Sequence, residues 1–160
     1  MYTAQYNSPI GVLTLAATRD ALCGLWICGQ KYHGTTDGAA RDTDNIALRR
    51  AMHWLDEYFA GRAPEINFNI NPTGTVFQRR VWHELSLIPH GQTVTYGDIA
   101  HRIGCKSARA VGMAIGHNPI SIIIPCHRVI GANGKLTGYA GGIKTKEKLL
   151  KLERGAMRAK

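Results

Sequence analysis

The stretch TYGDIAHRIGCKSARAVGMAIG, residues 95–116, decides the fold of the second half of the chain. Thr95 and Asp98 have the spacing of a helix capping box, and Ser107 is a good N-cap for a second helix after the break at 104–106. Two short helices joined by a glycine-containing turn predict a helix-turn-helix, although an ordinary αα-hairpin is the commoner arrangement.

The second of these helices has an unusual surface for a protein that recognises bases in the major groove. Its small residues leave it nearly bare, and Arg109 is its one long exposed donor. A smooth helix permits close approach to the DNA backbone and to the minor groove, where sequence preference is weak. We therefore expect Arg109 to enter the base stack while small neighbours lie against the DNA: Ser107, Ala108 and Ala110.

The charge distribution favours a polyanionic partner. The net charge is +9, but residues 1–72 carry 6 Lys/Arg against 7 Asp/Glu, and residues 73–160 carry 14 against 4. A basic excess confined to one half is the electrostatic signature of nucleic acid binding. The alternative is a solvated basic tail, because much of the excess comes from seven residues near the end of the chain: Lys144, Lys146, Lys148, Lys151, Arg154, Arg158 and Lys160.

The first half has a different pattern. Apolar and polar residues alternate along the first third of the chain, which predicts an antiparallel meander. From Asp44 the apolar residues recur at helical steps, and Gly61 is a suitable stop. Residues 66–70 alternate again and predict another strand. The chain is therefore expected to be an α/β (α+β) protein, with an N-terminal sheet and helix followed by a mostly helical part.

Turn residues at 71–74 coincide with the change in charge balance, so we place a domain boundary there, between 1–72 and 73–160. With 44% hydrophobic and 19% charged residues, the composition is ordinary for a folded protein. No apolar run approaches about 18 residues, and the N-terminus lacks a secretion signal. The four cysteines have no metal-ligand spacing. We expect a cytoplasmic, monomeric protein without a membrane partner, metal or cofactor.

A reactive thiol is predicted within IIIPCHRVI, residues 122–130. The isoleucine run predicts an interior strand that ends at Pro125 and presents Cys126. His127 and Arg128 favour the thiolate, although adjacent side chains of an extended segment point apart, so water or a turn must link Cys126 to the imidazole. The alternative is a structural cysteine beside a surface histidine. Four acidic residues could orient the imidazole, and the sequence does not choose among them: Glu84, Asp98, Glu147 and Glu153.

The segment PCHRVI (125–130), together with GHNP (116–119) and GYAGG (138–142), resembles the active-site region of the 6-O-alkylguanine-DNA alkyltransferases. The resemblance spans about residues 77–153. It implies that 73–160 binds duplex DNA carrying alkylated guanine and, after base flipping, transfers an alkyl group from the guanine 6-oxygen irreversibly to Cys126. It leaves repair at the thymine 4-oxygen open. The zinc ligands of some members have no complete counterpart here.

The resemblance also implies roles for individual residues. Cys126 is the alkyl acceptor, His127 activates it through water, and Glu153 orients the imidazole. Tyr96 is similar to the tyrosine that protonates the leaving guanine, and Arg109 to the finger that fills the vacated stack. The remaining substrate or DNA contacts are expected at Asn118, Arg128, Val129, Tyr139 and Ala140, where backbone groups of Val129 and Ala140 contact the guanine edge and Tyr139 forms a pocket wall.

Two other classes of function compete with alkyl transfer. A non-catalytic DNA-binding or lesion-recognition regulator would use the helix-turn-helix without chemistry, but the Cys126–His127 pair argues against it. A cysteine hydrolase would use the same pair, but has no need of a smooth basic helix. An alkyl thioether offers water no electrophilic carbonyl, so alkyl transfer predicts a protein consumed in one turnover.

Overall fold

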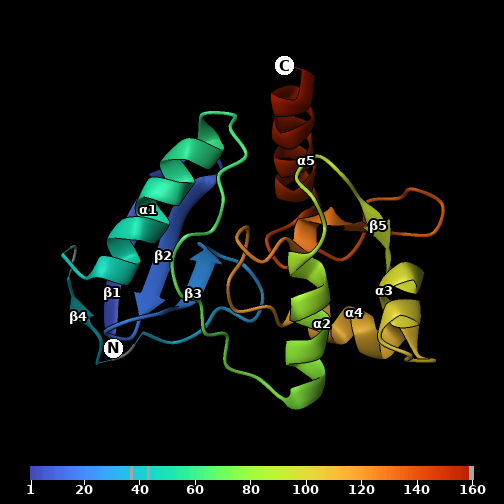
Figure 1. Cartoon of the computed structure of the whole chain (residues 1–160), viewed down its shortest axis with the longest axis horizontal. Helices are drawn as coiled ribbons and strands as arrows, with labels where there is room; N and C mark the ends of the chain where they lie inside the picture. Colours follow the sequence, from blue (N-terminus) through green and yellow to red (C-terminus); the bar gives the residue numbers. More distant parts are fainter. Residues whose placement is uncertain (37, 43, 159–160) are drawn as a thin grey trace.

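The N-terminal part is built on a four-stranded sheet in the order β3-β2-β1-β4 (Figure 1). The computed structural model describes residues 1–36, 38–42 and 44–158. The first three strands form the predicted antiparallel meander, and a short fourth strand lies parallel to β1. The strands are β1 (Tyr2–Ser8), β2 (Gly11–Ala17), β3 (Leu22–Ile27) and β4 (Ala40–Arg41).

Helix α1 (Ile46–Phe59) packs on this sheet, as the helical spacing predicts. The side chain of Asn45 caps it by accepting a hydrogen bond from Leu48 N. The predicted strand at 66–70 is wrong, because that segment forms only one bridge to the sheet, between Ile70 and Leu22. Its alternation reflects partial burial, and Pro72 has no N–H with which to continue a ladder.

The second half is mostly helical, and the predicted mixed α/β architecture is confirmed (Figure 1). Thr75 and Gln78, and then Thr95 and Asp98, form capping boxes, while Ser107 accepts from Ala110 N at the start of the second predicted helix. The helices are α2 (Val76–Ser86), α3 (Tyr96–Arg102), α4 (Ala108–Gly116) and α5 (Ile143–Arg158). Two short parallel strands, β5 (Val94–Thr95) and β6 (Val129–Ile130), complete this part.

The isoleucine run does not form the predicted interior strand. Residues 121–124 form a turn in which Ile122 has φ 71° and Ile124 N donates to Ile120 O at 3.0 Å. Burial explains the apolar pattern, because Ile120 and the three isoleucines at 122–124 are each at most 3% exposed. An apolar run requires burial but does not require an extended backbone. The turn leads into a 3-10 helix, η1 (Cys126–Arg128).

One hydrophobic core extends through both halves of the chain, from Ala4 of β1 to Leu149 of α5. The two halves also meet at Leu25, whose N–H donates to Pro119 O at 2.8 Å. The boundary near residue 72 therefore separates segments that share a core, and their division into two domains stays a prediction. Among the described residues, no helix has the length and apolar character needed to cross a membrane.

Candidate active site

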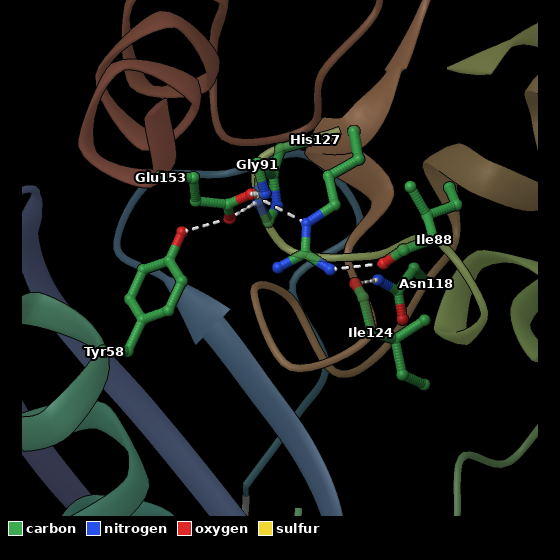
Figure 2. Close-up of polar contacts among 8 residues, drawn as sticks. Tyr58, Ile88, Gly91, Asn118, Ile124, His127 and Glu153 are labelled. Atoms are coloured by element: carbon green, nitrogen blue, oxygen red, sulfur yellow. Dashed lines mark hydrogen bonds and ion pairs between the residues drawn. The ribbon is translucent and has the colours of Figure 1, made fainter. Parts of the chain in front are cut away.

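The loop that carries Cys126 is held by the side chain of Asn118 (Figure 2). Asn118 Nδ2 donates to Ile124 O at 2.8 Å, and Asn118 Oδ1 accepts from Ile120 N at 3.0 Å. Asn118 is 4% exposed, so its hydrogen bonds fix the turn without competition from bulk water. Cys126 follows directly after this turn, as the first residue of η1, and is 6% exposed.

His127 and Glu153 form a buried pair on adjacent elements, η1 and α5. His127 Nε2 lies 2.5 Å from Glu153 Oε2, and both side chains are completely buried. Of the four acidic residues that could orient the imidazole, the structure brings Glu153 to it. The alternative of a surface histidine is wrong, because His127 is 0% exposed.

Glu153 accepts further hydrogen bonds from three directions (Figure 2). Tyr58 Oη donates to Oε2 at 2.6 Å, Arg128 Nε donates to Oε1 at 2.8 Å, and Gly91 N donates to Oε1 at 3.4 Å. The carboxylate therefore joins α1, the 87–93 loop and η1 at a single point of α5. Such complete satisfaction is the condition under which a buried charge is tolerated.

Arg128, which we expected to contact substrate or DNA, is held by contacts within the protein. Its side chain is largely buried, its Nε binds Glu153, and its Nη1 donates to Ile88 O at 2.6 Å. The buried Glu153 carboxylate requires a cationic partner, and Arg128 supplies it. Arg128 is therefore part of the support of the imidazole–carboxylate pair.

The electrostatics favour an ionised Glu153 and a neutral His127. Burial acts to raise the pKa of Glu153, but its hydrogen bonds with His127 and Arg128 and the charge of Arg128 outweigh this and hold the pKa well below its usual range. Burial lowers the pKa of His127 from its ordinary value, despite the opposing carboxylate. A neutral imidazole whose Nε2–H donates to an ionised Glu153 agrees with both lowered pKa values. Its Nδ1, buried and without a hydrogen-bond partner among the described residues, then carries the free lone pair.

Burial opposes ionisation of the Cys126 thiol, and a lysine favours it. Burial raises the pKa of Cys126, while the side chain of Asn118 and the charge of Lys146 act to lower it. Lys146 is 0% exposed and its Nζ donates to Val129 O and, at 2.9 Å, to Thr137 O. Burial lowers the pKa of Lys146 itself to about 8. The positive charge that lowers the pKa of the thiol thus comes from Lys146 of α5 and not from the adjacent Arg128.

The alternative of a solvated basic tail does not hold for Lys146, because this lysine is buried. It lies three residues before Leu149 and seven before Glu153, which places all three on one face of α5. All three are 0% exposed, whereas Lys144, Lys148 and Lys151 are exposed. The helical spacing to Leu149 was the signal in the sequence that could have separated Lys146 from the other lysines.

Of the residues expected to contact guanine, Tyr96 and Tyr139 lie close enough to Cys126 to interact with its charge. Tyr96 Oη donates to Thr137 O at 3.0 Å, and burial raises the pKa of Tyr96, which keeps its phenol protonated. The Tyr139 ring lies edge-on to the His127 ring at 6.5 Å between centroids. Val129 O accepts from Lys146, and Ala140 O accepts from Lys31 N at 3.1 Å. Backbone groups at these two positions are therefore held by residues that the sequence did not assign to the site.

Contributions from the first half of the chain had no signal in the sequence. Tyr58 lies 95 positions before the Glu153 carboxylate that it contacts. Gln30 accepts from Ile27 N at 2.6 Å and from Ser121 Oγ at 3.3 Å, so the loop after β3 supports the turn that leads to Cys126. Nothing in the local pattern around Tyr58 or Gln30 distinguishes them from ordinary core or loop residues.

The expected DNA-contacting residues lie apart from the buried cluster, at the start of α4. Ser107, Ala108 and Arg109 are exposed, and Ala110 is half-buried. Arg109 forms no hydrogen bond or ion pair with the residues that the structure describes. Its guanidinium is therefore available to a partner, and the small neighbours leave the helix surface open.

Comparison with known proteins matches the two halves of the chain to two domains of one kind of protein. Residues 1–72 match the family model of the 6-O-methylguanine DNA methyltransferase ribonuclease-like domain, and residues 76–155 match that of its DNA binding domain. A methylated-DNA–protein-cysteine methyltransferase of Methanosarcina acetivorans is 48% identical, covering 96% of this chain and 98% of the relative. One from Mycolicibacterium paratuberculosis is 49% identical, covering 92% and 89%.

Solved structures extend the likeness to three dimensions. The crystal structure of Mycobacterium tuberculosis OGT in complex with DNA has a TM-score of 0.90 and 46% sequence identity, covering 98% of this chain and 94% of that one. An O6-methylguanine DNA methyltransferase from Methanococcus jannaschii has a TM-score of 0.67 and 26% identity, covering 95% and 92%.

Fold and site together define a DNA-binding protein with a buried cysteine next to a histidine–glutamate pair. Within that class, the two family models and the relatives of nearly 50% identity all point to one family. The chain belongs to the 6-O-methylguanine DNA methyltransferase family.

Proposed function

We propose that this protein repairs DNA directly, by transferring an alkyl group from the 6-oxygen of guanine in duplex DNA to its own Cys126. The observation that carries the assignment is the buried Cys126 beside the His127–Glu153 pair, in a chain that also presents the exposed Arg109 on a smooth helix. It is a single-turnover methylated-DNA–protein-cysteine methyltransferase, with the thymine 4-oxygen as a second candidate source of the alkyl group.

The transfer follows from the charge states at the site. Neutral His127 accepts the Cys126 thiol proton at Nδ1 through a bridging water, and Glu153 stabilises the resulting imidazolium. The thiolate attacks the alkyl carbon and forms a C–S bond while the C–O bond to guanine breaks. The electron pair of that bond goes to the base, which takes a proton from Tyr96, and the proton held by the His127 imidazolium then passes through water to the Tyr96 phenolate. The products are an alkyl thioether at Cys126 and an unmodified guanine that remains part of the DNA.

The alkylated base must leave the stack to reach a thiol that is 6% exposed. We assign the minor groove as the docking site of α4, with Ser107, Ala108 and Ala110 against the backbone and Arg109 in the space left by the flipped base. Sequence preference is weak because the contacts are mainly to phosphate. We place the protein in the cytoplasm, as a monomer that joins the nucleoid when it binds DNA.

Intact mass after incubation with methylated duplex DNA tests the proposed function. The expected result is a gain of one methylene mass per chain, located on the peptide that contains Cys126. If the protein bound the methylated duplex completely and its mass did not change, the protein would be a DNA-binding protein that transfers no alkyl group. Repeated release of product, with the protein mass unchanged, would indicate a hydrolase.

Replacing Arg109 by alanine is expected to slow repair of duplex lesions about tenfold or more, with little change in reaction with a free alkylated guanine base. The reason is that Arg109 stabilises the gap in the stack, which the free base does not have. Single-turnover rates on the two substrates measure the difference. Equal losses on both would show that Arg109 does not act in flipping.

Replacing Lys146 by methionine is expected to raise the pKa of Cys126 and to slow transfer about tenfold at neutral pH, since one pKa unit changes the thiolate fraction tenfold. The difference from wild type should shrink as pH rises, because the thiol of the variant ionises at higher pH and the wild-type Lys146 loses its charge near its pKa of about 8. Lys148→Met is the matched control, since Lys148 is exposed on the same helix. Identical pH–rate profiles for the two variants would contradict this role.

A further inference from the structure

A cationic cleft lies between the outer face of α2 and the C-terminal end of α3, and none of the roles assigned above uses it. Its volume is about 430 Å³. Three arginines and a histidine line it, with one carboxylate and an apolar floor: Arg79, Arg80, His83, Arg102, Glu84 and Ile103. The arginines come from two helices, so the tertiary fold, and no local run of sequence, gathers them.

The arginines of this cleft form no ion pair with the described carboxylates. The side chains of Arg79 and Arg102 are exposed and form neither a hydrogen bond nor an ion pair with the described residues. Asp98, one turn before Arg102 on α3, is the acidic group that faces it: hydrogen bonds with Thr95, and then the charge of Arg102, lower the pKa of Asp98. Glu84 lines the same cleft, yet it forms no ion pair with any described cation. Arg80 is fixed in place, because its Nη2 donates to Ile103 O at 2.9 Å and so satisfies a carbonyl at the end of α3. One anchored and two unpaired guanidinium groups form a site for an anion.

The cleft is adjacent in the chain to the helix assigned to DNA binding. Ile103, at its floor, ends α3, and only Gly104, Cys105 and Lys106 separate it from Ser107, the N-cap of α4. The exposed Lys106 lies within that connection, and Arg109 lies in the first turn of α4. The cleft thus lies near the end of α4 where the proposed flipping residue is found.

We infer that the cleft binds backbone phosphates of the DNA that flanks the flipped guanine, with Arg79 and Arg102 as the phosphate ligands. The inference rests on the proposed function and extends it, because it adds a second contact region outside α4. Guanidinium groups suit phosphate oxygens through paired N–H donors, and such contacts fix position without reading sequence. The contribution is therefore to affinity and its salt dependence, and not to the chemistry at Cys126.

The double substitution Arg79→Ala/Arg102→Ala tests this inference, and Arg80 is retained because it caps α3. Arg49→Ala/Arg50→Ala is the matched control, because both residues are exposed on α1 and their side chains form no hydrogen bond or ion pair with the described residues. Helix α1 lies across the molecule from α3 (Figure 1). Affinity for a lesion-containing duplex is measured over a range of salt concentrations, with every variant carrying Cys126→Ser to prevent transfer.

The cleft variant is expected to bind about tenfold more weakly near 0.1 M salt, and its salt slope should be less steep by about 1 to 2, since each phosphate contact contributes about 0.9. The control variant should keep the slope of the parent. An unchanged slope in the cleft variant, or equal losses in both, would overturn the inference. Transfer from a free alkylated base to otherwise wild-type protein should not change, so failure of the proposed chemistry is seen separately from failure of the cleft.

Discussion

Cys126→Ser is expected to lower the rate of alkyl transfer at least about a thousandfold, while binding to the methylated duplex is retained. Serine keeps the shape of the side chain, but its hydroxyl ionises far less readily than a thiol and is a much weaker nucleophile when un-ionised. The His127–Glu153 pair remains in the variant, yet it has no thiol to deprotonate. Transfer of labelled methyl from duplex DNA to protein, followed at excess protein, measures the loss.

Stoichiometry separates this expectation from its alternatives. Wild-type protein should accept one labelled group per chain and then stop, because the thioether offers no route back to the thiol. The control variant Cys28→Ser changes an exposed cysteine that follows β3 and should keep full transfer. Label appearing on the Cys126→Ser protein at a comparable rate would exclude Cys126 as the acceptor.

Local features of the fold were predictable from the sequence because their physical causes are local. Thr95 with Asp98, and Ser107 with the helix after it, satisfy helix N-termini through residues three positions apart, so their spacing predicts both helices. The meander of β1 to β3 follows from alternation in the same way. These predictions needed no knowledge of which segments meet in space.

The errors arose where burial and geometry are set by distant parts of the chain. The isoleucines at 122–124 are buried as expected, but Asn118 folds them into a turn, and an apolar run alone does not distinguish turn from strand. The role of Arg128 as the cation beside the buried Glu153 also had no local signal in the sequence. The choice of Glu153 as the orienting acid came from the resemblance, because its approach to His127 depends on how α5 packs against η1.

Glu153→Gln is expected to destabilise the protein by about 3–5 kcal/mol, the usual effect of leaving a buried charge without its partner. An amide keeps the size of the carboxylate, but it removes the negative charge opposite Arg128 and presents an N–H₂ group to donors that require an acceptor. The free energy of unfolding in denaturant measures this loss. Tyr58→Phe is the matched comparison: it removes one hydrogen bond to the same carboxylate and should cost only about 1–2 kcal/mol. Equal small losses would show that the carboxylate charge is not needed.

The pH dependence of stability distinguishes the charge of Glu153 from its packing. Because the folded pKa of Glu153 lies below its unfolded value of 4.5, the unfolded chain takes up a proton first as pH falls, and stability is lost progressively below about that value. The folded pKa of His127 is also lowered, so its contribution to the loss begins at a higher pH, near the unfolded value of 6.5. Glu153→Gln has no carboxylate to protonate at this position and should lose the step below pH 4.5 while retaining a decline that begins near 6.5. A variant whose unfolding free energy fell with pH in parallel with the wild type across both ranges would show that Glu153 is not ionised in the folded protein.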